Sequence, residues 1–257
     1  MLAEMEITHV PVRFPEIDVA RGIAVIMMVV FHTAFDLRFL GCVPLNVSTG
    51  FLRLLALSTA SLFLFLVGVS LSISAAHAGT RLTRKDFILK YVIRGAFIFA
   101  LGMGISAVTR IVIPSEYVRF GILHLIGFSV MASPLYSRSG WQSLLLGAVF
   151  IALGPVMAGI RGSPWLLVSG IHPPEFSSVD YVPVFPWMGL VLTGVFAGTA
   201  IYPAGKRRPG SPGFTFPPLE VLGRHSLAIY LVHQPVIIAV ILLFSAVLGM
   251  NFAFPAG

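Results

Sequence analysis

The sequence has few charged residues and almost no cysteine. Only 11% of its 257 residues are Asp, Glu, Lys or Arg, whereas a soluble domain carries about 25%. Because Cys42 is the one cysteine, an intramolecular disulfide and a thiolate metal cluster are both excluded. An internal repeat of the kind that many carriers show is also absent. What remains is 57% hydrophobic, with a mean hydropathy of +0.94, and this composition predicts a polytopic membrane protein.

Acidic residues are scarcer than basic ones. Ten Asp and Glu stand against 17 Lys and Arg, which gives a formal net charge of +7. In a membrane protein the basic residues first report orientation across the bilayer. We therefore expect no nucleic-acid partner, and we expect an integral membrane protein.

Seven hydrophobic stretches are long enough to cross a bilayer, at about 20 residues each. They predict an all-α bundle of about seven transmembrane helices that forms a single domain over residues 1–257. The expected helices lie near 18–38, 51–75, 88–109, 119–136, 142–160, 183–202 and 226–249. With seven spans, twelve Lys and Arg residues fall on one side and five on the other. The positive-inside rule then predicts a cytoplasmic N-terminus and an outer C-terminus.

The first of these stretches, DVARGIAVIMMVVFHTAFD, carries four ionisable residues on one face. At about 100° per residue, Asp18 and Asp36 share a radius of the helix, and Arg21 and His32 fall within about 60° of them. Ionisable groups at membrane depth cost about 2.5–3.5 kcal/mol each on insertion scales. They persist where they face a partner or a watery cavity, so each of them indicates a functional site.

The two ends of this face have different explanations. Asp18 complements the helix dipole and Arg21 can extend to the interface, so both have a structural explanation. His32 lies about 16 Å further along the axis, where such an extension is harder. Asp36 follows His32 by one turn, and we expect the two to form an acid–imidazole pair. The alternative is a buried histidine that is satisfied by a helix neighbour.

The last stretch, LGRHSLAIYLVHQPV, carries a second polar face. Ser226, Tyr230 and His233 fall within about 60° of one another, and Gln234 widens the arc to about 100°. Pro235 removes a backbone donor, so we expect a kink beside His233. Freed backbone groups at membrane depth usually line a protein-enclosed site.

Two other segments carry polar groups near the expected outer side. His124 stands between two glycines, three residues from each, which predicts either a groove or a close helix crossing. Asp180 and Trp187 flank the start of the sixth stretch, where Asp180 is a hydrogen-bond acceptor for a polar substrate and Trp187 is either substrate-facing or interfacial. Gly194 and Gly198 have GxxxG spacing, which hints at a homodimer and predicts tight packing.

Four segments together resemble one family. They are EIDVARGIAVIMMVVFH, SLFLFLVGVSLSIS, RFGILHLIGFS with DYVPVFPWMGLVLTGVFAG, and LGRHSLAIYLVHQPV. These are similar to the catalytic domain of heparan-alpha-glucosaminide N-acetyltransferase, in its short prokaryotic branch, and the likeness covers roughly residues 13–245. The first segment also resembles the wider membrane acyltransferases that modify bacterial surface glycans. The resemblance to a prokaryotic branch implies a protein of a prokaryotic plasma membrane.

The resemblance implies transfer of an acetyl group from cytosolic acetyl-CoA across the membrane to an amino or hydroxyl group of a sugar or glycan. By position, His32 and Arg21 match the first-helix motif of the surface-glycan enzymes. The last-helix segment of the family is matched by Arg224, His225, Ser226 and His233. The family's suggested acyl-carrying histidine in the first outer loop has no counterpart, because residues 38–50 contain no histidine.

The polar faces suit this chemistry. An amine or alcohol that attacks a thioester needs a base, and an imidazole is suited to that role, so we expect His32, Asp36 and His233 to be catalytic. The developing oxyanion needs a donor, which Tyr230, Gln234 or His233 can supply. We expect the phosphates of acetyl-CoA to meet basic residues on the inner side: Arg21, Arg84, Lys85, Arg207, Arg224 and the neighbouring His225 and Ser226. We expect His124, Asp180, Trp187, Tyr230 and Gln234 to contact the acceptor.

Three other interpretations remain. Histidines and carboxylates on facing helices also form proton relays, so a proton-coupled transporter of a small polar solute is the main alternative. A metal site formed by His32, Asp36, His124 and His233 has permitted ligands but no standard spacing, and we expect no metal. A structural protein with packed polar residues is the third.

Overall fold

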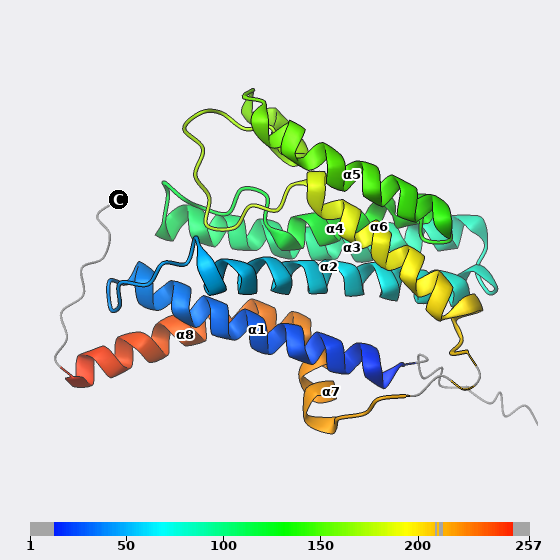
Figure 1. Ribbon diagram of the computed structural model, residues 1–257, viewed down its shortest axis with the longest axis horizontal. Helices are drawn as coiled ribbons and strands as arrows, with labels where there is room; N and C mark the ends of the chain where they lie inside the picture. The colour runs from blue at the N-terminus through cyan, green and yellow to red at the C-terminus, as the bar shows by residue number, and fades with distance from the viewer. Residues whose placement is uncertain (1–12, 209, 211–212, 249–257) are drawn as a thin grey trace, which may run out of the picture.

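The computed structural model describes residues 13–208, 210 and 213–248, and this part of the chain is almost entirely helical (Figure 1). Its elements are α1 (Pro15–Phe39), α2 (Gly50–Gly79), α3 (Arg84–Val112), α4 (Ile122–Ala132), η1 (Ser133–Leu135), α5 (Trp141–Gly159), η2 (Pro164–Ser169), α6 (Val184–Ile201), η3 (Pro203–Gly205), α7 (Pro217–Arg224) and α8 (Ser226–Leu248).

Six of the described helices are long and apolar enough to span a membrane: α1, α2, α3, α5, α6 and α8. The predicted all-helical membrane architecture is therefore confirmed. The fourth predicted span, near 119–136, contains only the shorter apolar segment Ile122–Leu135. Seven spans thus remain a prediction, as does the side of the membrane on which each terminus lies.

The helices form layers that pack side by side (Figure 1). Helix α2 lies at the centre, where it packs against α1 on one face and α6 on the other. Beyond these, α5 packs on α6, α4 packs on α3, and α7 and α8 pack on α1. The largest fully buried side chains lie where α2, α3, α4 and α6 meet, and they include Tyr91, Leu64, Leu125 and Leu192.

Small residues set the closest of these approaches. A Cβ on Gly68 of α2 would collide with the carbonyl oxygen of Val191 on α6, and a Cβ on Gly194 would collide with that of Phe65. A Cβ on Gly198 would collide with the side-chain oxygen of Ser72 on α2. The Gly194–Gly198 pair is therefore covered by α2 of the same chain. It does not support the homodimer that its spacing suggested.

Helix α7 is an element that the hydropathy pattern did not predict. Pro217 and Pro218 open it, and prolines are tolerated in a first helical turn. It crosses α1 so closely that a Cβ on Gly22 would meet the carbonyl of Leu219, and a Cβ on Gly223 would meet that of Asp18. This crossing carries the start of α8 to the start of α1.

The outward faces of the long helices are apolar and exposed. On α1 they include Ile23, Ile26 and Val30, which lie opposite the polar face, as the helical periodicity predicted. Helices α3, α5 and α8 expose similar faces. Apolar faces of this kind are what lipid contacts in a bilayer.

Candidate functional site

Two cavities lie along α1, one beside each end of the helix. The basic cavity has a volume of about 520 Å³ near the start of α1, and it is lined by Arg13, Phe14, Ile17, Asp18, Arg21, Ser70, Ile73, Ser74, His77, Arg81, Lys90, Arg94 and Arg224. The histidine cavity has a volume of about 780 Å³ near the other end of α1, and its polar lining includes His32, Asp36, Asp180, Tyr230, His233 and Gln234. The polar face of α1 thus serves both cavities.

The basic cavity is organised around the buried carboxylate of Asp18. One oxygen of this carboxylate accepts a hydrogen bond from Arg21 Nη1 at 2.9 Å, and the other lies 3.7 Å from Arg224 Nε. Arg224 also binds Glu220 at 2.7 Å, within α7. The second terminal nitrogen of Arg21 donates to Ser70 on α2. Asp18 therefore holds two of the arginines that line this cavity.

The other cations of the basic cavity have no such partner. Within the described residues, no ion pair joins a carboxylate to Arg13, Arg81, Lys90 or Arg94. Six cationic side chains therefore surround a cavity that has one carboxylate. Such an excess of positive charge suits an anion with several phosphates, because guanidinium groups bind phosphate oxygens in pairs.

Only part of the predicted cofactor set lines this cavity. Arg21 and Arg224 do, whereas Arg84, Lys85, His225 and Ser226 line neither cavity. Arg207 binds Glu16 instead, at 2.5 Å. Arg81, Lys90 and Arg94 also line the cavity, although in the sequence they served only to predict the orientation of the protein in the membrane. The available signal was the spacing of Lys90 and Arg94, which are one helical turn apart on one face.

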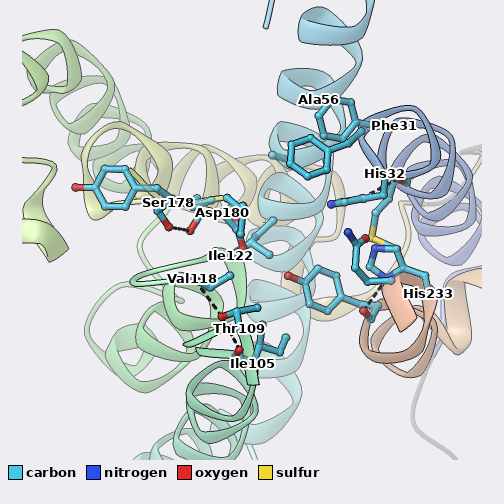
Figure 2. A pocket seen from close by; sticks show the side chains of 18 of the residues that line it. Phe31, His32, Ala56, Ile105, Thr109, Val118, Ile122, Ser178, Asp180 and His233 are labelled. Atoms are coloured by element: carbon cyan, nitrogen blue, oxygen red, sulfur yellow. Dashed lines mark hydrogen bonds between the residues drawn. The ribbon is translucent and has the colours of Figure 1, made fainter. Parts of the chain in front are cut away.

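The histidine cavity lies between α1, α2, α3 and α8 and is closed on one side by the segment that precedes α6. His32 comes from α1 and His233 from α8, and Figure 2 shows them together on one side of the cavity. Ser178 and Asp180 lie on the opposite side, near Ile122 (Figure 2). Helices far apart in the sequence therefore bring the two polar faces together, as a shared site requires.

The two imidazoles touch edge to face. Their ring centroids are 4.8 Å apart, with an interplanar angle of 72°. His32 Nδ1 lies 2.9 Å from the carbonyl oxygen of Met28, and His233 Nδ1 lies 2.7 Å from that of Tyr230. A carbonyl only accepts, so each Nδ1 carries the proton and each Nε2 of the neutral ring keeps a lone pair.

The expected acid–imidazole pair between His32 and Asp36 is not formed. Asp36 Oδ1 instead accepts a hydrogen bond from Gln234 Nε2 on α8 at 2.8 Å. The prediction was wrong because each histidine on these helices is satisfied by a carbonyl three or four residues earlier, which leaves the carboxylate to the facing helix. Three buried atoms here have no hydrogen-bond partner within the described chain: Asp36 Oδ2, His233 Nε2 and Gln234 Oε1.

Asp180 and His124 hold the start of α4. Asp180 Oδ2 accepts from the backbone N–H of Ile122 at 3.0 Å, and His124 Nδ1 accepts from that of Gly121 at 3.1 Å. Burial raises the pKa of Asp180 to about 6, and the Ile122 bond works in the opposite direction. Asp180 and Trp187 line the histidine cavity and His124 does not. Of the two glycines around His124, Gly127 serves a close crossing, since it packs against Gly95 and Phe99 of α3, and Gly121 leaves room for the carboxylate of Asp180.

The described residues contain no group of three or more His, Cys, Asp or Glu side chains arranged to hold a metal ion. The polar groups of the histidine cavity are suited instead to hydrogen bonding and to accepting a proton.

Comparison with known proteins bears on this arrangement. The family model described as heparan-alpha-glucosaminide N-acetyltransferase, catalytic, matches residues 13–235. Searches of curated proteins and of solved structures found no match. The matched region contains the linings of both cavities except for Ile238, and the family implies an acyltransferase of the N-acetyltransferase type. Because the match covers most of the sequence, the chain belongs to the heparan-alpha-glucosaminide N-acetyltransferase catalytic-domain family.

Proposed function

We propose that this protein transfers an acetyl group from acetyl-CoA, bound from the cytosolic side, to an amino or hydroxyl group of a sugar on the outer side. The observation that carries the proposal is the pair of cavities along α1, one rich in unpaired cations and the other holding two touching imidazoles. A transferase that uses a polyanionic donor and a neutral nucleophile needs both environments. The choice of acetyl-CoA as the donor rests on family membership.

The basic cavity is the proposed site of the phosphate groups of acetyl-CoA. Arg81, Lys90 and Arg94 supply cations that no carboxylate of the described residues neutralises. Arg21 and Arg224 form ion pairs with Asp18, which fixes their positions in the part of the cavity lining that α1 forms. From Arg21 to His32 the axis of α1 rises about 16 Å, and the pantetheine arm spans this distance in the proposed complex.

The histidine cavity is the proposed site of the chemistry. Nε2 of His32 or His233 takes a proton from the acceptor as its nitrogen or oxygen attacks the thioester carbonyl. The new N–C or O–C bond forms, the C–S bond breaks, and the leaving thiolate of CoA receives the proton from the imidazolium. The hydrogen bonds from Nδ1 to the Met28 and Tyr230 carbonyls keep both rings in the tautomer that this step needs.

Tyr230 is the proposed donor to the oxyanion. Of the three donors that the sequence suggested, Gln234 already donates its amide nitrogen to Asp36, and His233 Nδ1 faces the Tyr230 carbonyl. The Tyr230 hydroxyl lines the same cavity and has no hydrogen-bond partner among the described residues. It is therefore free to stabilise the charge that develops on the carbonyl oxygen.

The test compares His32→Ala and His233→Ala with His172→Ala in acetyl transfer by purified protein in lipid nanodiscs. His172 lies outside both cavities, so that variant controls for loss of a histidine. General-base catalysis contributes about 10²–10⁴-fold, so we expect kcat to fall by at least about 10²-fold in one or both cavity variants, while acetyl-CoA binding is kept. If both cavity variants transfer acetyl as fast as His172→Ala, the imidazoles are not part of the reaction. If no variant and no wild type binds acetyl-CoA, a proton-coupled transporter becomes the better interpretation.

A further inference from the structure

The lining of the histidine cavity is mostly apolar. Four of its polar side chains form one end, the polar end, and they are His32, Asp36, His233 and Gln234. Ser178 and Asp180 lie on the opposite side. The remaining walls are built from aliphatic and aromatic side chains, among them Phe31, Phe35, Leu57, Phe63, Leu101 and Ile105. A cavity of about 780 Å³ is large enough for a drug-sized ligand, so most of what fills it must tolerate apolar contact.

One wall of the cavity continues onto the outer surface of the bundle. Val108 and Val112 of α3 line the cavity and yet are 61% and 71% exposed. Ile238 lines it from α8. Helices α3 and α8 do not pack extensively against each other within the described residues. Helix α8 packs on α1 and α7, and α3 packs on α4 and α2. Because the exposed faces of α3 and α8 are apolar, this wall opens toward lipid.

At the polar end of the cavity, unpartnered acceptors outnumber the one free donor named above, the Tyr230 hydroxyl. Asp36 Oδ2, Gln234 Oε1 and His233 Nε2 are buried acceptors without a partner within the described residues. A buried acceptor without a donor is destabilising, so the site is suited to a head group that carries N–H or O–H donors. The carboxylates of Asp36 and Asp180 in the lining complement an amino group in charge. A whole free oligosaccharide fits poorly, because its other hydroxyls would lose their hydrogen bonds to water against the apolar walls.

We infer that the acceptor is an amphiphile, namely an amino- or hydroxyl-bearing sugar joined to a long apolar chain. Its head group occupies the end of the cavity at His32 and His233, and its chain lies along the apolar wall and leaves between α3 and α8 into the bilayer. This inference rests on the proposed function for the role of the head group. The position inferred for the apolar chain of the acceptor depends only on the shape and lining of the cavity.

The first experiment measures binding, which does not require transfer. Radiolabelled dodecyl β-D-glucosaminide and methyl β-D-glucosaminide are titrated onto the protein in nanodiscs, and empty nanodiscs supply the background of chain partitioning. We expect saturable binding of the dodecyl compound at concentrations where the methyl compound does not bind. Each buried methylene contributes up to about 0.8 kcal/mol, or about fourfold in affinity. Saturable binding of both compounds with the same affinity, or of neither, would overturn the inference.

Matched variants test where the apolar chain of the acceptor lies. Val108→Trp fills the opening from α3, and Ile238→Trp fills it from α8. Their controls are Ile111→Trp and Val236→Trp, which place the same ring on lipid-facing positions of the same helices outside the cavity lining. We expect at least a tenfold loss of dodecyl binding in each cavity variant that keeps its fold, and no loss in its control. Equal binding in all four variants would contradict the placement of the chain.

Transfer kinetics separate this inference from the proposed function. If both hold, kcat/KM for acetylation is higher for the dodecyl acceptor than for the methyl acceptor, and Val108→Trp removes most of that preference. If dodecyl binding is saturable and sensitive to Val108→Trp but no acetyl is transferred, the proposed function fails and the amphiphile site stands. If acetyl is transferred equally to both acceptors, the proposed function stands and the inference fails.

Discussion

The two cavities share one helix and differ in almost every other respect. At the start of α1, charges lie close together and are partly matched, since Asp18 holds Arg21 and Arg224. Near the other end, His32 and His233 touch edge to face, and three buried acceptors have no partner among the described residues. The first region has the character of an anion-binding site, and the second combines imidazoles with buried hydrogen-bond acceptors.

In the proposed function, a single polar face serves two steps, donor binding and acetyl transfer. Buried atoms without partners cost stability, and natural proteins keep few of them. Their concentration beside the two imidazoles therefore indicates a ligand-filled position. The basic cavity has one such atom, Asp18 Oδ2, but its main imbalance is an excess of positive charge, which a polyanion balances. Variants that alter one cavity and leave the other intact test whether the two regions have these separate roles.

The largest effect expected in the basic cavity comes from Arg94→Ala. Removing one charge-assisted hydrogen bond costs about 1.5–3 kcal/mol, so we expect acetyl-CoA binding to weaken by about 10–100-fold with little change in kcat. Lys85→Ala is the matched comparison, because Lys85 lies on the same helix outside both cavities. Calorimetric titration of acetyl-CoA onto both variants measures the difference. A larger loss in Lys85→Ala than in Arg94→Ala would favour the sequence-based assignment over the cavity.

A smaller and more structural effect is expected from Gly223→Ala. The added Cβ would meet the carbonyl of Asp18, so α7 must move away from α1 and carry Arg224 with it. Overpacking of this kind costs about 1–3 kcal/mol, and we expect a lower melting temperature together with weaker acetyl-CoA binding. Gly159→Ala is the control, since a Cβ there meets nothing within 4 Å. Unchanged acetyl-CoA affinity in a destabilised Gly223→Ala protein would show that the position of α7 does not affect acetyl-CoA binding in the basic cavity.

The smallest effect concerns pH and the histidine cavity. Burial raises the pKa of Asp180 from 3.8 to about 6, so the folded protein binds this proton more tightly than the unfolded chain does. Its contribution to stability is therefore present below pH about 4 and is lost as the pH rises to about 6. Asp180→Asn keeps an acceptor for the Ile122 N–H and removes the titration. We expect the melting temperature of wild type to decline more steeply than that of the variant across this range, and parallel curves would contradict the assignment.

The sequence predicted the membrane fold and the polar face of α1, because both depend on composition and helical periodicity. It also predicted that His32 and the group around His233 belong to one site, and the structure brings them into contact. It could not predict which partner each polar atom chooses. The pairing of Asp36 with Gln234 depends on the rotation of α8 against α1, which tertiary packing sets.

The basic cavity was harder to predict for a related reason. Its residues come from several helices and connecting segments, and in the sequence each cation is adequately explained by orientation in the membrane. Arg84 and Lys85 stand near the correct residues in the sequence, but only Lys90 and Arg94 of the same helix line the cavity. Helix α7 escaped prediction because eight residues with two prolines and mixed polarity do not resemble a membrane span.

In the proposed reaction, the phosphates of acetyl-CoA lie in the basic cavity and its acetyl group reaches the histidine cavity, so the acetyl group crosses the membrane. The most direct measurement encloses labelled acetyl-CoA in proteoliposomes and supplies methyl β-D-glucosaminide, at concentrations far above those that saturate dodecyl binding, either outside or enclosed with the donor. Transfer across the membrane predicts labelled sugar when donor and acceptor are on opposite sides and none when they share a side, whatever the mixture of protein orientations. Labelling only when both substrates share one side would contradict it.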